Sequence, residues 1–265
     1  MRDFLNPIKE KINNGEIATG FAITLSDPQL SELVGLAGCD FVWIDGEHGA
    51  MGRSEMVNLM IGAHAGGAAA FVRVNSQDPR NIRQVLDMGP EAIVFPLIGT
   101  ADDARQAVAA CTYPPHGVRG FCPIRASKYG SHDISDYYYN HFKDLWRIMI
   151  IETLEGSKNI EEIVQVEGVD AVVLGYGDLS VDMGLYGQFT HPDVQGAMAH
   201  SAEICRKYNK PILYFPTGSE DMKAWIKNGA KLFSFGFDAF ALSAHIRSHF
   251  PVLEKALQEV AEEEK

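Results

Sequence analysis

The sequence predicts an α/β protein whose eight parallel strands close into a (β/α)8 barrel, and three observations predict it. Eight short apolar runs alternate with amphipathic segments along the chain. The runs are almost continuously apolar, which is typical of parallel strands covered on both faces. The chain has 265 residues, and such a barrel typically needs about 250. The sequence therefore favours a single barrel domain over residues 1–265, with an open doubly wound sheet as the alternative.

The strands are expected where β-branched and aromatic residues are bounded by turn residues. In chain order these runs cover residues 18–25, 39–47, 68–74, 91–98, 146–153, 170–178, 210–216 and 231–238. Several segments between the runs begin with Ser, Thr or Asp and end at Gly, which are signals for the start and end of a helix. Gly175 and Gly177 are followed by Ser180 where a dinucleotide-binding fingerprint needs a third glycine. This absence counts against the open sheet.

Two segments depart from the simple repeat. Residues 112–145 form a connection much longer than usual between a helix and the next strand, which indicates a functional loop or an interface. Arg119 and Arg125 within it are candidates for recognising a distal carboxylate, and a structural ion pair is an equal alternative. The tail from Ala239 to Lys265 carries a helical pattern, and its acidic end is expected to be a solvated helix terminus.

Composition and motifs exclude several classes of protein. The formal net charge is −12, whereas nucleic-acid binders usually carry a positive footprint. No apolar run has the length of a signal peptide or of a membrane span, and the four scattered cysteines fit a reducing cytoplasm. Lys210 and Lys231 precede their strands, so they lie on the wrong rim for a Schiff-base aldolase. The chain also lacks the motifs of serine hydrolases and P-loop proteins.

Polar residues cluster where the predicted strands end, which is where a barrel carries its chemistry. The second strand ends in Asp45-Gly46-Glu47-His48, the third in Arg73, the fifth in Glu152 and the sixth in Gly177-Asp178. A single acid at such a position is often only a helix cap. Two carboxylates, a histidine near an aspartate and an arginine at one mouth predict a catalytic site.

Each of these residues suits a particular role. Glu152 and Asp178 come from adjacent strands, and two carboxylates that leave most of the coordination sphere open suit Mg²⁺ or Mn²⁺, with Co²⁺ as a further candidate. Arg73 offers a planar fork for a carboxylate or a developing enolate oxygen. His48, three residues after Asp45, is expected to be oriented by that carboxylate and to act as a base.

Several motifs in a fixed order resemble the HpcH/HpaI aldolases, the class II metal-dependent pyruvate aldolases. The motifs are WIDGEHG at 43–49, FVRVNSQDP at 71–79, YPPHGVRG and RASKYG within 113–130, IIETLEG at 150–156, LGYGDLSVDMG at 174–184, HPDVQ at 191–195 and FSFGFD at 233–238. The resemblance covers nearly the whole chain. It implies metal binding by Glu152 and Asp178, a base dyad of His48 and Asp45, and contact of Arg73 with the substrate's keto oxygen. It also implies a homo-oligomer, often a hexamer, that exchanges its C-terminal helices from about residue 239.

The chain departs from the family pattern at three positions. Ile150 stands where the family usually has Gln, Tyr176 and Gly177 stand where it reads Pro-Ala, and Ala22 stands where a Trp is common. All three departures lie at or near the expected pyruvate pocket. We therefore count Ile150, Tyr176, Gly177, Asp178 and Phe215, together with Arg73, as the expected substrate-binding residues. A different 2-oxo acid or an altered stereochemical preference is an alternative.

The expected function is reversible aldol cleavage of a 4-hydroxy-2-oxo acid into pyruvate, or a close 2-oxo acid, and an aldehyde. Two other functions stay open. One is a related barrel lyase acting on a CoA thioester or a phosphoenolpyruvate-like substrate, which a nucleotide or phosphate requirement would indicate. The other is a non-catalytic 2-oxo-acid binding protein, which would show ligand-induced stabilisation without turnover.

Overall fold

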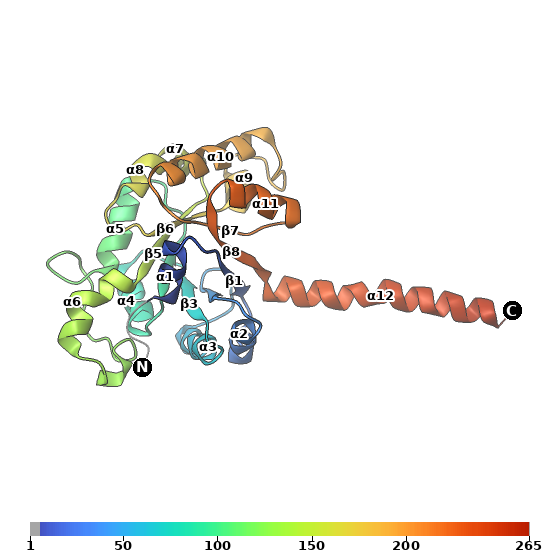
Figure 1. Ribbon diagram of the computed structural model, residues 1–265, viewed down its shortest axis with the longest axis horizontal. Helices are drawn as coiled ribbons and strands as arrows, with labels where there is room; N and C mark the ends of the chain where they lie inside the picture. The colour runs from blue at the N-terminus through green and yellow to red at the C-terminus, as the bar shows by residue number, and fades with distance from the viewer. Residues whose placement is uncertain (1–5, 265) are drawn as a thin grey trace.

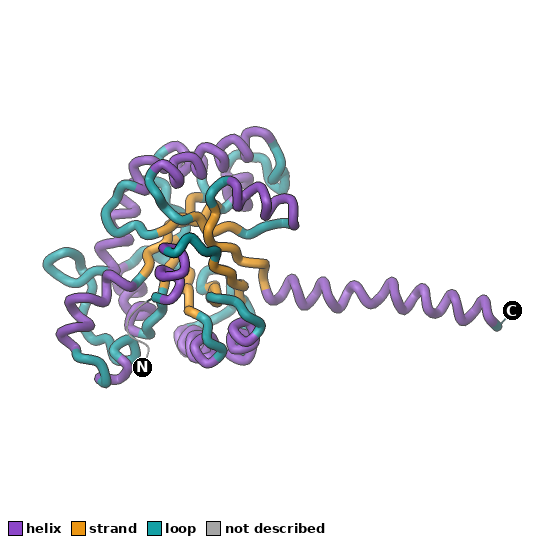
Figure 2. Tube along the Cα trace, viewed as in Figure 1, coloured by secondary structure: helices purple, strands orange, loops and turns teal. Residues whose placement is uncertain are grey.

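The computed structural model describes residues 6–264, and their side chains except those of residues 141–143. Its eight strands form one closed parallel barrel in chain order, so the predicted barrel is confirmed. The strands are β1 Ala18–Ile23, β2 Phe41–Asp45, β3 Ala69–Arg73, β4 Ala92–Phe95, β5 Trp146–Ile151, β6 Ala171–Leu174, β7 Ile212–Tyr214 and β8 Ala230–Phe237. Figure 2 shows these strands at the centre of the molecule with helices around them.

The helices follow the strands around the outside of the barrel (Figure 1). They are α1 Pro7–Asn13, α2 Pro28–Leu36, α3 Arg53–Ala65, α4 Pro79–Asp87, α5 Ala101–Cys111, α6 Ile134–Asp144, α7 Leu154–Lys158, α8 Ile160–Val164, α9 Tyr176–Asp182, α10 Pro192–Lys207, α11 Ser219–Lys227 and α12 Asp238–Glu263, with a 3₁₀ turn at Lys128–Gly130. The capping signals are used as expected. For example, the carboxylates of Asp27 and Asp78 accept the backbone N–H two residues on, and a proline follows each of them.

Two apolar layers explain why strands β2 to β7 are buried on both faces. Side chains such as Phe41, Trp43, Phe71 and Ile150 fill the interior of the barrel. The alternate side chains, such as Ile44 of β2, pack outward against the helices. Because side chains alternate along a strand, Asp45 points the same way as Trp43 and Phe41. This alternation therefore places the carboxylate of Asp45 at the mouth of the barrel.

The predicted strand ends are wrong by two to four residues at four of the site-bearing elements. Strand β2 ends at Asp45 because its carboxylate accepts the backbone N–H groups of Glu47 and His48, which turns the chain. Strand β5 ends at Ile151, so Glu152 is the first residue after it. Strand β6 ends at Leu174, and Asp178 lies in the first turn of α9 instead of in the strand.

The C-terminal helix α12 leaves the barrel and projects away from it (Figure 1). Its first residue, Asp238, is buried, and its carboxylate accepts the backbone N–H groups of Thr24, Leu25 and Ala239. This cluster fixes the base of the helix to the end of β1. Within residues 6–264, no helix has the length and apolar character of a membrane span.

Candidate active site

The mouth of the barrel is formed by the carboxyl ends of the strands, where Asp45 and Arg73 face each other. The two residues are register partners on β2 and β3. Nε of Arg73 donates to Oδ1 of Asp45 at 3.0 Å, and Nη2 of Arg73 pairs with Oδ2. Both side chains are buried, with Asp45 fully so. Burial acts to raise the pKa of Asp45, but the hydrogen bonds and charge of Arg73 hold it below its usual value.

Glu47 is a second partner of Arg73, and sequence reasoning missed it. Its Oε2 lies 3.0 Å from Nη1 of Arg73, so the guanidinium pairs with the carboxylates of both Asp45 and Glu47. Burial raises the pKa of Glu47 in spite of the charges of Arg73 and His48. The sequence signal for Glu47 is its position inside the DGEH run, between Asp45 and His48.

His48 lies at the mouth, but the structure does not place its imidazole against Asp45. Asp45 binds the backbone N–H of His48 at 3.1 Å, while the imidazole Nε2 lies 3.9 Å from Oε2 of Glu47. The side chain of His48 is 64% exposed. The carboxylate expected to orient the ring is therefore occupied by Arg73, and the ring is free to turn toward a bound molecule.

Glu152 is a buried carboxylate at the end of β5. Its Oε1 accepts the backbone N–H of Leu97 at 2.7 Å. Leu97 adopts a left-handed backbone conformation, with a φ of 55°. A Cβ on Gly175 would lie 2.8 Å from Cβ of Glu152, so the close approach of β6 needs glycine there. Burial, with smaller contributions from the charges of Asp178 and Glu47, raises the pKa of Glu152 to about 7 against the opposing hydrogen bond from Leu97.

The charge of Asp178 is close enough to Glu152 and Glu47 to contribute to the raised pKa of both carboxyl groups. Asp178 is exposed in the first turn of α9. Among the side chains that the structure describes, no three of His, Cys, Asp or Glu are grouped closely enough to enclose a metal ion. A pair of hard oxygen donors with excess negative charge does fit a Mg²⁺-type cation, which keeps most of its ligands as water and substrate.

The remaining expected pocket residues divide between the two apolar layers. Ile150 is buried in the barrel interior, and Phe215 and Phe237 pack against that interior. Tyr176 instead packs with Tyr214 in the outer layer, and its hydroxyl donates to the carbonyl of Phe215 at 3.3 Å. The structure therefore brings Ile150 and Phe215 together but places the ring of Tyr176 outside the barrel. At Gly177 an added Cβ would meet only open space.

The long connection after α5 lies at the opposite end of the barrel from its own mouth, because it leads from a helix into the start of β5. Arg119 is fully buried and pairs with Asp87 at 2.9 Å. Arg125 binds His64 and the carbonyl of Met88. Arg119 thus makes a structural ion pair, Arg125 makes structural hydrogen bonds, and neither reaches the mouth of its own barrel.

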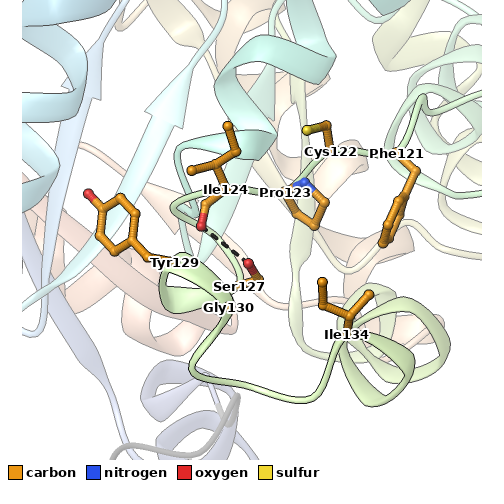
Figure 3. Close-up of a pocket in the computed structure, with 8 residues that line it drawn as sticks. All are labelled: Phe121, Cys122, Pro123, Ile124, Ser127, Tyr129, Gly130 and Ile134. Atoms are coloured by element: carbon orange, nitrogen blue, oxygen red, sulfur yellow. Dashed lines mark hydrogen bonds between the residues drawn. The ribbon is translucent and has the colours of Figure 1, made fainter.

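The same connection lines an open apolar pocket of about 310 Å³ on the surface (Figure 3). Its lining residues are Phe121, Cys122, Pro123, Ile124, Ser127, Tyr129, Gly130 and Ile134. The hydroxyl of Ser127 is turned inward to the carbonyl of Ile124. The pocket carries none of the expected site residues.

A parallel barrel with an arginine and paired carboxylates at the carboxyl ends of its strands is typical of a barrel enzyme. The model of the HpcH/HpaI aldolase/citrate lyase family matches residues 19–244. The chain belongs to this family, and it is a carbon–carbon lyase by that membership. This confirms the resemblance inferred from the motifs.

One relative and two solved structures resemble this chain over most of its length. A 5-keto-4-deoxy-D-glucarate aldolase from Escherichia coli O139:H28 is 31% identical over 236 residues, which cover 89% of this chain and 91% of the relative. The crystal structure of an HpcH/HpaI aldolase from Desulfitobacterium hafniense DCB-2 has a TM-score of 0.87 and 25% identity, covering 93% of this chain and 96% of that one. The crystal structure of the citrate synthase SbnG has a TM-score of 0.86 and 28% identity, and the match covers 94% of this chain and 98% of that one.

Proposed function

We propose that this protein is a metal-dependent aldolase that reversibly cleaves a 4-hydroxy-2-oxo acid into pyruvate, or a close 2-oxo acid, and an aldehyde. The observation that carries the proposal is the convergence of buried Arg73 with the carboxylates of Glu152 and Asp178 at one mouth. The similarity to an aldolase of 5-keto-4-deoxy-D-glucarate supports a keto acid as substrate.

Each residue of the site has a distinct role in the proposed reaction. Glu152 and Asp178 would hold Mg²⁺, Mn²⁺ or Co²⁺, which when bound supplies Lewis-acid stabilisation of negative charge on the substrate oxygens. Arg73 donates to the 2-oxo oxygen, which gains negative charge as the carbon–carbon bond breaks. Because Asp45 and Glu47 hold its guanidinium before substrate arrives, little reorganisation is needed at that moment.

His48 is the proposed base, which takes the proton of the 4-hydroxyl during cleavage and returns it during synthesis. Its exposed ring and the nearby Glu47 suit this role, since the ring has room to turn toward the substrate. Replacing His48 with Ala is expected to lower the rate of cleavage by about 10²-fold, because a positioned base contributes at least that much. The measurement is pyruvate release from 4-hydroxy-2-oxopentanoate with Mn²⁺. His116→Ala, outside the mouth, is the control, and unchanged turnover in His48→Ala would refute this role.

The similarity to the citrate synthase SbnG supports a second candidate function. This is a related barrel enzyme that makes or breaks a carbon–carbon bond in a CoA thioester or a phosphoenolpyruvate-like substrate. Turnover of 4-hydroxy-2-oxo acids without any nucleotide or phosphate would exclude it.

We also propose that the protein works as a homo-oligomer, a hexamer by resemblance, in which α12 packs on a neighbouring copy. One face of α12 carries six apolar side chains at helical spacing: Leu242, Ile246, Phe250, Leu253, Leu257 and Val260. All six are more than half exposed. In a regular barrel the helix after β8 would cover the space between α11 and α2, where Leu33 and Leu36 of α2 are exposed. A neighbour's α12 would fill this space.

Replacing Leu253 with Glu should weaken this association about 100-fold, since it removes a buried leucine and places a charge in an apolar contact. Gln258→Glu puts the same charge on the opposite face of α12 and is the control. Light scattering during gel filtration measures the mass against the 29.2 kDa of one chain. A wild-type protein that runs as a monomer would contradict the proposal.

The four cysteines are free, which supports a cytoplasmic location.

A further inference from the structure

Trp43 occupies the boundary between the filled interior of the barrel and the site above it. It lies on β2, two residues before Asp45, and its side chain belongs to the interior layer. The guanidinium carbon of Arg73 lies 5.7 Å from the centre of its ring. The indole is 1% exposed, so it forms the floor directly beneath the arginine that faces the substrate.

The surroundings of Trp43 are apolar on every strand that contacts it. Its register partners are Ala22 on β1 and Phe71 on β3, and the small side chain of Ala22 leaves room for the indole. Phe215 packs edge-on against the ring, with centroids 5.4 Å apart at 86°. Phe237 stacks on Phe215. None of these side chains accepts a hydrogen bond.

The indole N–H of Trp43 is consequently a buried donor without a hydrogen-bond partner among the described residues. A buried polar group in this state costs free energy, and native structures seldom keep one without a reason. Ile150, in the same interior layer, has no polar atom to offer a substrate. The indole N–H of Trp43 is a donor in this layer, beneath Arg73.

We infer that Trp43 is a substrate-contacting residue whose Nε1–H donates a hydrogen bond to a carboxylate or oxo oxygen of the bound 2-oxo acid. The inference rests on the proposed function, since it needs a 2-oxo acid beneath Arg73. It also defines the substrate class more closely. The expected substrate is a short, planar acid with one oxygen directed at the indole, beside which Phe215 supplies apolar surface.

The indole N–H can be observed directly, because the chain has three tryptophans. In ¹⁵N-tryptophan-labelled protein, the Trp43→Phe variant identifies the Trp43 resonance by its loss. Adding saturating pyruvate with Mg²⁺ is expected to move this resonance downfield, as a new hydrogen bond to an anionic oxygen does, and to leave those of Trp146 and Trp225 in place. Binding is followed separately from broadening of the pyruvate methyl signal. A Trp43 resonance that stays unchanged while pyruvate binds would overturn the inference and would fit an N–H directed at the ring of Phe215.

Kinetics separates a contact from a structural role. Trp43→Phe keeps an aromatic ring and loses the donor, so KM for the 2-oxo acid should rise about 10- to 100-fold with a smaller change in kcat. Trp146→Phe makes the same change at the opposite end of the same barrel interior and should leave KM unchanged. Equal KM values for Trp43→Phe and wild type would overturn the inference. If wild type itself neither binds pyruvate nor turns over a 4-hydroxy-2-oxo acid, the proposed function fails instead.

Discussion

Replacing Arg73 with Ala is expected to lower aldol cleavage by about 10³-fold and to destabilise the fold by about 3–5 kcal/mol. The activity falls because the substrate oxygen loses its donor. Stability falls because Asp45 is fully buried, and its carboxylate would lose the charge that compensates it. Urea unfolding and the rate of pyruvate release from 4-hydroxy-2-oxopentanoate measure the two effects separately.

A double variant distinguishes the two effects of this change. Asp45→Asn with Arg73→Met removes the buried charge and keeps an oxygen that can accept the N–H groups of Glu47 and His48. We expect this variant to recover most of the lost stability and none of the activity, since a buried ion pair replaced as a unit costs little. If Arg73→Ala retained wild-type turnover, Arg73 would have no role in the reaction.

Replacing Glu152 with Gln is expected to weaken Mn²⁺ binding and to reduce turnover by about 10³-fold, because Lewis-acid stabilisation contributes several kcal/mol. Glutamine keeps the size of the side chain and an oxygen that can accept the N–H of Leu97. The fold should therefore survive, and urea unfolding checks this. Mn²⁺ affinity is measured from the relaxation rate of water protons, which needs no substrate.

The matched control is Glu155→Gln, which neutralises an exposed carboxylate three residues along the chain. It should bind Mn²⁺ as wild type does. A Glu152→Gln variant with unchanged Mn²⁺ affinity would remove this residue from the metal site and leave Asp178 and Glu47 to be tested in its place.

The sequence allowed the barrel to be predicted because most of the strands are buried on both faces. Continuous apolar runs such as residues 92–95 carry this signal plainly, and the intervening helices carry capping residues. The predicted strand ends lie too late because the predicted runs include the polar residues that follow the strands. At Asp45, the strand ends where the carboxylate accepts the backbone N–H groups of Glu47 and His48, and composition gives no sign of this.

The positions of the expected site residues at the strand ends could be predicted, and their side-chain contacts less well. Strand ends place Asp45, Arg73 and Glu152 at one mouth, because parallel strands all point the same way. Which carboxylate pairs with which cation depends on side-chain rotamers. The pairing of Asp45 and Glu47 with Arg73, and the turned-away ring of Tyr176, therefore needed three-dimensional packing.

Exchange of the C3 protons of pyruvate into deuterated water, followed by NMR, tests the central claim most directly because it needs no knowledge of the aldehyde. The account predicts exchange with Mg²⁺ or Mn²⁺ that stops when a chelator is added and is lost in Glu152→Gln and Arg73→Ala. Absence of exchange with wild-type protein and every divalent metal tried would contradict the claim that this barrel forms the enolate of pyruvate.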